Sequence, residues 1–303
     1  MVYIVIPCYN ESVAIFRMLS ELEGVLGGVN ESFSVVVMDD CSTDDTVSQL
    51  MQFNFKATNL KLNVLSTDIN LGHQQAIRQA LLFVHQQGGR KAIVLDADGE
   101  DDPFVIPQML AVMDADIVQV QRGKRAETMM FRFCYAWYNF IFNLLIGKKM
   151  SVGNYCLINE KVIRLISTQS FFHFGAFLSR LPLKRKRIVS DRRKRMGGES
   201  KMTYSRLFYH ALKSFIEYGE ELITLFLKLT IALVLLFLSF LAIIVYLKFF
   251  TDLAILGWAS TIGAGLLACT LICAGFFVSG ILLLRISQNR NQQPAVHLYQ
   301  LIR

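Results

Sequence analysis

The sequence predicts an α/β protein in which a mostly parallel sheet is followed by two C-terminal transmembrane helices. Short apolar runs alternate with segments of helical periodicity from residue 2 to residue 121, a pattern typical of a doubly wound sheet. The last third of the chain holds two long apolar stretches without charge. With 53% hydrophobic residues and a mean hydropathy of +0.40, the chain is also too apolar for an ordinary soluble enzyme.

Five runs rich in β-branched and aliphatic residues predict buried strands, and four of them lead into helices. The expected strands are Val2–Pro7, Ser34–Met38, Leu62–Ser66, Ala92–Leu95 and Ile117–Gln121. The expected helices are Ser12–Leu26, Thr46–Phe53, Gln74–Gln87 and Pro103–Met113. Because parallel strands need a crossover connection, usually a helix, this alternation predicts a mostly parallel sheet.

Two more helices are expected between this core and the apolar stretches. Met129–Ile146 is rich in aromatic residues, and two placements stay open for it: along the membrane interface, or buried inside the domain. Tyr204–Tyr218 is amphipathic and is expected to run along the bilayer toward the first span. The chain is therefore expected to have three parts: a core over 1–125, a juxtamembrane part over 126–220, and a membrane region with a tail over 221–303.

Leu229–Leu247 and Leu253–Leu284 carry no charge, and each is long enough to cross a hydrocarbon core of about 30 Å. Basic residues flank the pair, whereas the connecting loop has little beyond Lys248 and Asp252. The flanking residues are Lys184, Arg185, Lys186, Arg187, Arg192, Arg193, Lys194, Arg195 and Lys201 before the first stretch, and Arg285, Arg290 and Arg303 after the second. The positive-inside rule then predicts that both flanks, and with them the N-terminal domain, face the cytoplasm.

The apolar start Val2–Ile6 is too short for a signal peptide and runs into Pro7. The net charge of +7 could indicate nucleic acid as a partner, but the basic residues concentrate beside the apolar stretches. Anionic lipids, and not nucleic acid, are therefore the expected partners, although a purely topological role for these charges stays open.

Four polar loops follow successive strands, and ligands of open α/β sheets bind at such carboxyl ends. The loops are Pro7–Glu11, Asp39–Thr46, Asp68–Gly72 and Asp96–Asp98. Two carboxylates spaced two residues apart, Asp96 and Asp98, point the same way if the strand continues, and they favour Mg²⁺ or Mn²⁺. Capping of the helix after Pro103 is the alternative for one of them. No Gly-x-Gly-x-x-Gly follows the first strand, which disfavours a dinucleotide site.

The chain resembles the family 2 glycosyltransferases of GT-A fold over roughly residues 3 to 213. It shares their Pro-x-Tyr-Asn-Glu start, their Asp-Asp-x-Ser-x-Asp-x-Thr loop and their Asp-x-Asp. With two C-terminal spans it is most similar to the polyprenyl-phosphate glycosyltransferases. The resemblance implies a GT-A, Rossmann-like sheet with interfacial helices. It also implies a metal-dependent, inverting transfer of sugar from a nucleotide-sugar donor, expected to be a UDP-sugar, to undecaprenyl phosphate at the cytoplasmic face of a bacterial inner membrane.

Residue by residue, the resemblance assigns one group to the nucleotide and another to the metal. The nucleotide group is Pro7, Tyr9, Asn10, Glu11, Asp39 or Asp40 for the base or ribose, Asn70, and Gly72. The metal group is Asp98, with Asp96 also facing the ribose and sugar, and Glu100 as a further candidate ligand. For Asp44 and Thr46, capping of the following helix is the favoured interpretation.

Basic residues are the candidates for the phosphates. Arg122 and Arg125 match the family's positions after the fifth strand, although solvated surface charge is an equal alternative for either. Arg195, Ser200 and Lys201 match an Arg-x-x-Gly-x-Ser-Lys loop that closes over the donor in the family.

One position departs from the family pattern. Many relatives carry an Asp, proposed as a base, where this chain has Asn154. An amide cannot serve as that base, but a phosphate acceptor is already ionised near neutral pH, because its second pKa is about 6. Asn154 is therefore expected to orient the acceptor by hydrogen bonding.

Two rival functions stay open. One is a glycosyltransferase that acts on a hydroxyl acceptor in cell-surface polysaccharide synthesis; the absence of a Gln-x-x-Arg-Trp segment counts against the processive type. The other is a catalytically silent nucleotide-binding membrane scaffold, which Asn154 supports and the Asp96 and Asp98 pair opposes. Glycines in and near the second span permit a homo-oligomer or packing against the first span: Gly257, Gly263, Gly265, Gly275 and Gly280.

Overall fold

The structure is a computed structural model that describes residues 1–122, 129–147, 153–191, 193–197, 204–251, 257–291 and 296–303. It divides into two compact units. The first comprises Met1–Asn139, Lys149–Glu217 and Asn291–Arg303, and the second comprises Phe140–Lys148 and Tyr218–Arg290. The tail that follows the last long helix thus belongs to the first unit.

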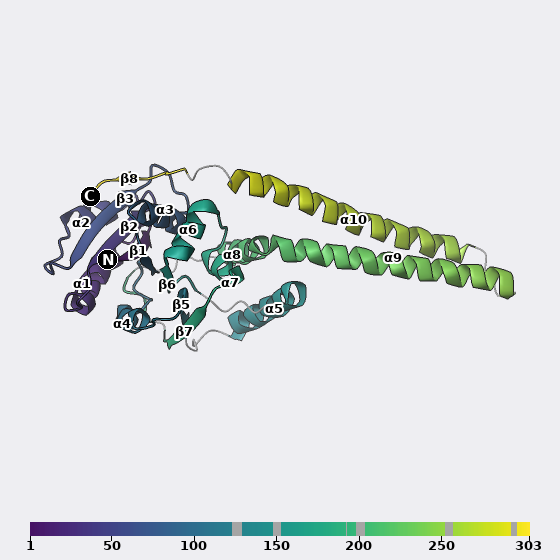
Figure 1. Ribbon diagram of the computed structural model, residues 1–303, viewed down its shortest axis with the longest axis horizontal. Coiled ribbons are helices and arrows are strands. Elements are labelled where there is room, and N and C mark those ends of the chain that lie inside the picture. The colour runs from purple at the N-terminus through teal and green to yellow at the C-terminus, as the bar shows by residue number, and fades with distance from the viewer. Residues whose placement is uncertain (123–128, 148–152, 192, 198–203, 252–256, 292–295) are drawn as a thin grey trace. The chain divides into compact units, whose positions relative to one another are not determined.

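An eight-stranded sheet in the order β7-β5-β6-β4-β1-β2-β3-β8 is the centre of the first unit (Figure 1). Its strands are β1 Val2–Cys8, β2 Phe33–Asp39, β3 Leu60–Ser66, β4 Lys91–Val94, β5 Ile117–Arg122, β6 Cys156–Asn159, β7 Arg185–Ser190 and β8 Gln300–Leu301. All but β6 and β8 run in one direction, since each of these two pairs antiparallel with its neighbours. The prediction of a mostly parallel sheet is confirmed.

Helices cover both faces of this sheet, as the alternation of side chains along β1 requires. Ile4 and Ile6 pack on one side with α1 Ser12–Leu26, α2 Thr46–Gln52 and α4 Ile106–Leu110. Val5 packs on the other side with α3 His73–Gln86, α6 Glu160–Thr168 and α7 Phe174–Arg180. Both layers are packed mainly with apolar side chains, so the sheet is a rigid platform for the loops at its ends.

Two stretches differ from the expectation. The helix expected over Pro103–Met113 is a short 3-10 turn, η1 Pro103–Val105, followed by α4, which ends at Leu110. Met113, at the end of the expected helix, is 90% exposed and does not pack against the core. The basic run from Lys184, for which the sequence predicts no strand, contains β7, Arg185–Ser190, which pairs in parallel with β5. Pairing with a distant strand leaves no signal in local composition.

The C-terminal tail adds an edge strand to the first unit. β8 pairs antiparallel with the end of β3, and the backbone of Ile302 donates to the carbonyl of Val64 over 2.9 Å. Gln79 of α3 holds the tail through both ends of its amide, which bind the carbonyl of Val296 and the N–H of Leu298. Chain on both sides of the long apolar helices is therefore part of one folded unit.

The second unit contains α9 Gly219–Phe250 and α10 Trp258–Asn291, which run side by side in Figure 1. Two stretches of these helices, Gly219–Phe250 and Ala259–Ile286, are long and apolar enough to cross a membrane. A Cβ on Gly280 would lie 2.6 Å from Ile223, so this glycine packs against the first long helix. The sequence allows the glycines in and near the second span either to form a homo-oligomer or to pack against the first span, and Gly280 does pack against the first span.

Two helices precede α9: α5 Met129–Ile146, with the predicted bounds, and α8 Tyr204–Glu217. Tyr138 bonds the hydroxyl of Ser214 over 2.6 Å, which joins one face of α5 to α8. Trp137 of α5 is 58% exposed. Phe142 of the same helix is fully buried, so the helix carries both exposed and buried aromatic side chains, and its placement along the membrane interface stays a prediction.

Candidate functional site

The first two predicted loops form one hydrogen-bonded platform at the carboxyl edge of the sheet. Asn10 has a positive φ of 53°, and its side-chain oxygen accepts from the N–H of Thr43 over 2.7 Å. The N–H of Asn10 in turn donates to Ser42 over 2.9 Å. Asn has a short polar side chain that tolerates the left-handed region, which explains its use at this turn. The loops after β1 and β2 therefore hold each other in place.

Asp39 and Asp40 have different partners, although both are buried. Asp39 accepts from the N–H of Ser42 and from the hydroxyl of Ser66, each over 3.2 Å. Asp40 accepts from the N–H groups of Leu71 and Gly72 over 2.7 and 2.8 Å. Burial raises the pKa of Asp40, against these two hydrogen bonds. Asp40 therefore holds the third loop in shape, and Asp39 is the better candidate to face a nucleoside.

Asp44 joins the starts of two helices. Its carboxylate accepts from the N–H of Thr46 over 3.0 Å and from the N–H of Ser12 over 3.2 Å. Burial would raise the pKa of Asp44, but the hydrogen bonds from Thr46 and Ser12 outweigh it and lower this pKa. The arrangement is that of a helix cap, so the capping interpretation of Asp44 agrees with the geometry.

The fourth loop presents the carboxylates of Asp96 and Asp98 just after β4. Asp98 accepts from the N–H of Glu100 over 3.0 Å, and the N–H of Asp96 donates to buried Asp101 over 3.0 Å. Only 19% of the Asp96 side chain and 14% of the Asp98 side chain are exposed. The loop is therefore rigid, and its carboxylates are set well below the surface.

The segment 193–197 lies across this acidic loop. Its backbone N–H groups at Arg193 and Met196 donate to the carbonyls of Glu100 and Asp98, each over 3.0 Å. Gly99 has a φ of 77°, and a Cβ there would lie 2.3 Å from the Met196 side chain. Only a glycine admits this close approach.

Arg195 places its guanidinium between two predicted site residues. One nitrogen lies 3.2 Å from Asp98, and the other pairs with Glu11. Loops that follow β1 and β4 are thus bridged by a cation from a distant segment. The family resemblance predicts one site that contains Glu11, Asp98 and Arg195, and the structure brings all three together.

Asp96 and Asp98 fit a divalent cation of the Mg²⁺ or Mn²⁺ type. Such ions prefer carboxylate oxygens and commonly bind through one or two of them together with water and substrate phosphate. The described residues contain no cluster of three or more His, Cys, Asp or Glu side chains able to hold a metal by themselves. The guanidinium at Asp98 is itself evidence that this position attracts positive charge. The fit is therefore to a metal shared with a phosphate ligand.

His73, the first residue of α3, joins the acidic loop to Asn154. Its Nε2 atom lies 3.3 Å from a carboxylate oxygen of Asp96 and 2.9 Å from the side-chain nitrogen of Asn154. Burial acts to lower the pKa of His73, but the carboxylates of Asp96, Asp98 and Asp101 outweigh it and raise this pKa. Donor and acceptor sides of the expected site thus meet at one imidazole.

The structure also places four of the remaining predicted residues: Pro7, Tyr9, Asn70 and Arg122. Pro7 is part of β1, Tyr9 is 39% exposed, and Asn70 donates to the carbonyl of Asp40 over 3.2 Å. Arg122 is the last residue of β5, opposite Ser190. Three predicted residues lie outside the described residues: Arg125, Ser200 and Lys201.

Three residues at this edge were not selected from the sequence: His73, Asp101 and Arg193. Arg193 forms a bidentate pair with Glu21 of α1 at 2.5 and 2.9 Å, which fastens the segment 193–197 to the first helix. For His73 a signal was available, since it directly follows the glycine of a strand-end loop. Asp101 and Arg193 gain their roles from tertiary contacts that no spacing rule reveals.

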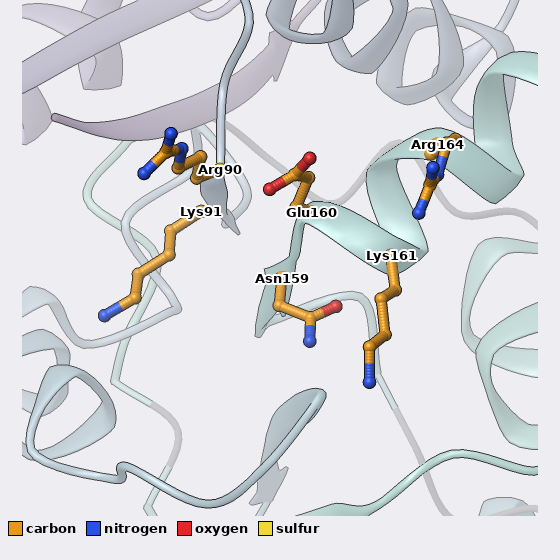
Figure 2. A pocket seen from close by; sticks show the side chains of 6 residues that line it. All are labelled: Arg90, Lys91, Asn159, Glu160, Lys161 and Arg164. Carbon is orange, nitrogen blue, oxygen red and sulfur yellow. The ribbon is translucent and has the colours of Figure 1, made fainter.

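A hollow of about 420 Å³ lies at the opposite edge of the sheet (Figure 2). It is lined by Arg90, Lys91, Asn159, Glu160, Lys161 and Arg164. Lys91 starts β4 and is paired with Asn159 at the end of β6, whereas Asp96 follows the other end of β4. This basic hollow is therefore separate from the acidic site.

Comparison with known proteins gives a family match over half of the chain. The family described as Glycosyl transferase family 2 matches residues 3–157. An uncharacterized glycosyltransferase, YkcC, of Bacillus subtilis is 24% identical over 301 residues, which cover 96% of this chain and 91% of the relative. The undecaprenyl-phosphate 4-deoxy-4-formamido-L-arabinose transferase of Pseudomonas savastanoi is 29% identical over 154 residues, covering 50% of this chain and 43% of the relative.

Solved structures share the fold. Glucosyl-3-phosphoglycerate synthase from Mycobacterium tuberculosis, in complex with Mn²⁺, UDP-glucose and phosphoglyceric acid, has a TM-score of 0.52 and 16% identity, and the match covers 73% of this chain and 79% of that one. Mannosyl-3-phosphoglycerate synthase from Rubrobacter xylanophilus has a TM-score of 0.52 and 15% identity, covering 73% and 74%. The GT-A-like architecture of the first unit is therefore shared with enzymes of known structure.

Proposed function

Because the chain belongs to glycosyl transferase family 2, we propose that it moves a sugar from a nucleotide-sugar donor to a polyprenyl phosphate at the cytoplasmic face of a bacterial membrane. One observation carries the proposal. The carboxylates of Asp96 and Asp98 lie at the carboxyl edge of the sheet, and the guanidinium of Arg195 lies against Asp98. Fixed carboxylates beside an arginine suit a metal-bound donor that brings its own diphosphate.

The donor side is supported by the four joined loops and by the fold neighbours. The synthase that shares the fold was solved with UDP-glucose and Mn²⁺. In this chain Asp39 is fixed by two hydrogen bonds at the place where a base or ribose is expected. We therefore propose a UDP-sugar as donor and Mg²⁺ or Mn²⁺ as the divalent cation.

The acceptor side is supported by the apolar helices and by the names of relatives. Several related transferases carry undecaprenyl phosphate in their names. The tail after α10 is a strand of the catalytic sheet, so both ends of the α9–α10 segment return to the same side of any membrane that they cross. A membrane hairpin keeps the whole sheet unit on one side of the membrane, so donor and lipid phosphate would be bound from that side.

The chemistry proposed is a direct displacement at the sugar carbon. Asp96 and Asp98 would hold the divalent cation, which would supply Lewis-acid neutralisation of the departing nucleoside diphosphate. Arg195 exchanges its contact with Asp98 for the donor phosphates, and Asn154 orients the acceptor oxygen by hydrogen bonding. A phosphate oxygen is already charged near neutral pH and needs no base at position 154. Attack from the face opposite the leaving group inverts the anomeric configuration.

The test is a transfer assay with the full-length protein in membranes. Radiolabelled nucleotide sugars are screened against undecaprenyl phosphate, and the lipid product is extracted. We expect Asp98→Asn to lower turnover by about 100-fold or more, since it removes a charged ligand from the leaving-group site. Asp114→Asn serves as the control, because Asp114 is 79% exposed and pairs with Lys184 at the other edge of the sheet.

Each alternative has its own outcome in this assay. Calorimetric binding of UDP and Mn²⁺ without any transfer contradicts the proposal and favours the scaffold. Transfer to a saccharide hydroxyl with none to the lipid phosphate favours the second kind of transferase. A product that keeps the anomeric configuration of the donor contradicts the inverting displacement.

A further inference from the structure

His73 connects two parts of the site that come from distant segments. Its Nε2 atom lies 3.3 Å from Asp96, after β4, and 2.9 Å from the amide nitrogen of Asn154, before β6. Asp96 belongs to the donor side and Asn154 to the acceptor side in the proposed reaction. The imidazole of His73 therefore contacts a residue on each side of the proposed site.

The backbone on both sides of His73 is held in place by hydrogen bonds. Gly72, with a φ of 85°, turns the chain into α3, and Asp40 binds the N–H groups of Leu71 and Gly72. The next residue, Gln74, is buried and accepts from the N–H of Phe174 over 2.6 Å. Both neighbours of His73 are therefore anchored to buried groups, so its ring leaves a rigid turn.

The side chain at 154 is suited to this contact. When Nε2 carries the proton that Asp96 accepts, the Asn154 amide meets the same N–H with its oxygen, because either end of an Asn amide can be assigned to this position. Unlike an aspartate, it adds no second negative charge beside Asp96. The His73 side chain is 43% exposed, so the joined pair also stays within reach of an entering acceptor.

We propose that His73 is a positioning residue that holds Asn154 against the donor side of the site and so sets the angle at which the acceptor oxygen meets the sugar carbon. The inference rests on the proposed function and deepens it. Small displacements of an orienting group lower turnover steeply, because reaction needs reacting atoms within about 3.5 Å and aligned. His73 acts on the reaction through Asn154.

The kinetic test uses the full-length protein in nanodiscs with a nucleotide sugar and undecaprenyl phosphate. We expect His73→Ala to lower kcat by about 10- to 100-fold and to leave the KM for the nucleotide sugar within about twofold. His73→Gln places an amide near the position of Nε2 and is expected to recover most of the lost turnover, whereas the shorter His73→Asn is not. His85→Ala, an exposed histidine near the other end of α3, is the control.

A double-mutant cycle with Asn154→Ala decides whether the two residues act together. The double variant is expected to lose about as much turnover as the more damaging single variant, since both remove one linkage. If the turnover losses of the two single variants multiply in the double variant, the residues act independently and the inference is overturned. Equal turnover of His73→Gln and His73→Asn also overturns it. A fall in nucleotide affinity or thermal stability that matches the loss of turnover also overturns it, because His73 would then be merely structural.

Failure of the proposed function is distinguishable in the same experiment. If the wild type transfers nothing to the lipid phosphate, the proposed acceptor is wrong. The cycle is then scored on thermal unfolding and on transfer of the sugar to water. Coupled losses of transfer to water at unchanged thermal stability keep the role of His73 for whatever acceptor the enzyme uses. Independent losses of that transfer, or a matching loss of thermal stability, overturn it.

Discussion

At the scale of the residue, the site is an acidic cluster in which an arginine side chain pairs with two of the carboxylates. Arg195 lies between Asp98 and Glu11, and all three side chains are largely buried. A guanidinium beside a carboxylate lowers the affinity of that carboxylate for another cation. The residue that approaches the donor phosphates in the proposed reaction therefore competes with the metal when no donor is bound.

We expect Arg195→Met to raise the affinity for Mn²⁺ without nucleotide by about three- to tenfold, because a competing positive charge is removed. The same change is expected to weaken binding of the nucleotide sugar. Isothermal calorimetry measures both constants. Lys194→Met, an exposed neighbour on the same segment, is expected to change neither. Unchanged or weaker Mn²⁺ binding in the Arg195 variant would contradict the competition.

Gly99 is required by the close approach of Met196. Gly99→Ala introduces a methyl group 2.3 Å from the Met196 side chain at a φ of 77°. We expect a loss of stability of about 1–3 kcal/mol, since both the backbone strain and the overlap oppose the native loop. Gly24→Ala, in helix α1 with nothing within 4 Å of its Cβ, is expected to be neutral or stabilising. Thermal unfolding of the two variants compares them directly.

Asp44 makes the joined loops sensitive to acid. Its pKa is lowered in the folded protein, so its stabilising contribution is complete above the unfolded value of about 3.9 and is lost as pH falls through the folded value. We expect Asp44→Asn to destabilise the protein near pH 7 and to flatten the pH dependence below about pH 4. Unfolding midpoints across pH 2–7 provide the check, and parallel curves for both proteins would contradict it.

At the scale of the element, the C-terminal tail completes the donor half of the sheet. It pairs with the end of β3, and Arg303 donates to the carbonyls of Leu50 and Met51 near the end of α2, each over 2.7 Å. A cation at a helix C-terminus satisfies carbonyls that lack partners within the helix. The elements that carry the second and third loops are thus fastened by the last residues of the chain.

We expect Gln79→Ala to release this tail. The Gln79 side chain is 1% exposed, and its amide makes both of its bonds to tail backbone, so their loss is expected to reduce stability by about 1–3 kcal/mol. Gln75→Ala, on the same helix, is the control. Thermal unfolding, together with protease cleavage of the tail, measures the effect. Equal melting temperatures for the two variants would contradict the proposed fastening.

At the scale of the whole molecule, the chain order itself constrains the topology. Residues before and after the two long helices belong to the same sheet, which a single crossing of a membrane would separate. Two crossings keep both on one side, in agreement with the basic residues that flank the pair.

A labelling experiment tests this topology. In a variant without native cysteines, Met113→Cys in the sheet unit is expected to react with an impermeant thiol reagent only in inverted vesicles. Phe250→Cys, at the end of α9, is expected to react only in right-side-out vesicles. Labelling of both from the same side would contradict a membrane hairpin.

The sequence by itself determined the fold class, the first five strands, the helices α1 to α3 and the two long apolar helices, because these follow from local periodicity and length. It also identified the acidic loop, since residues at the ends of parallel strands must gather at one edge. Only the tertiary structure decided that β7 and β8 complete the sheet, that Arg195 pairs with Asp98, and that His73 joins Asp96 to Asn154. Those contacts join segments far apart along the chain, and no local pattern encodes which distant partner a side chain meets.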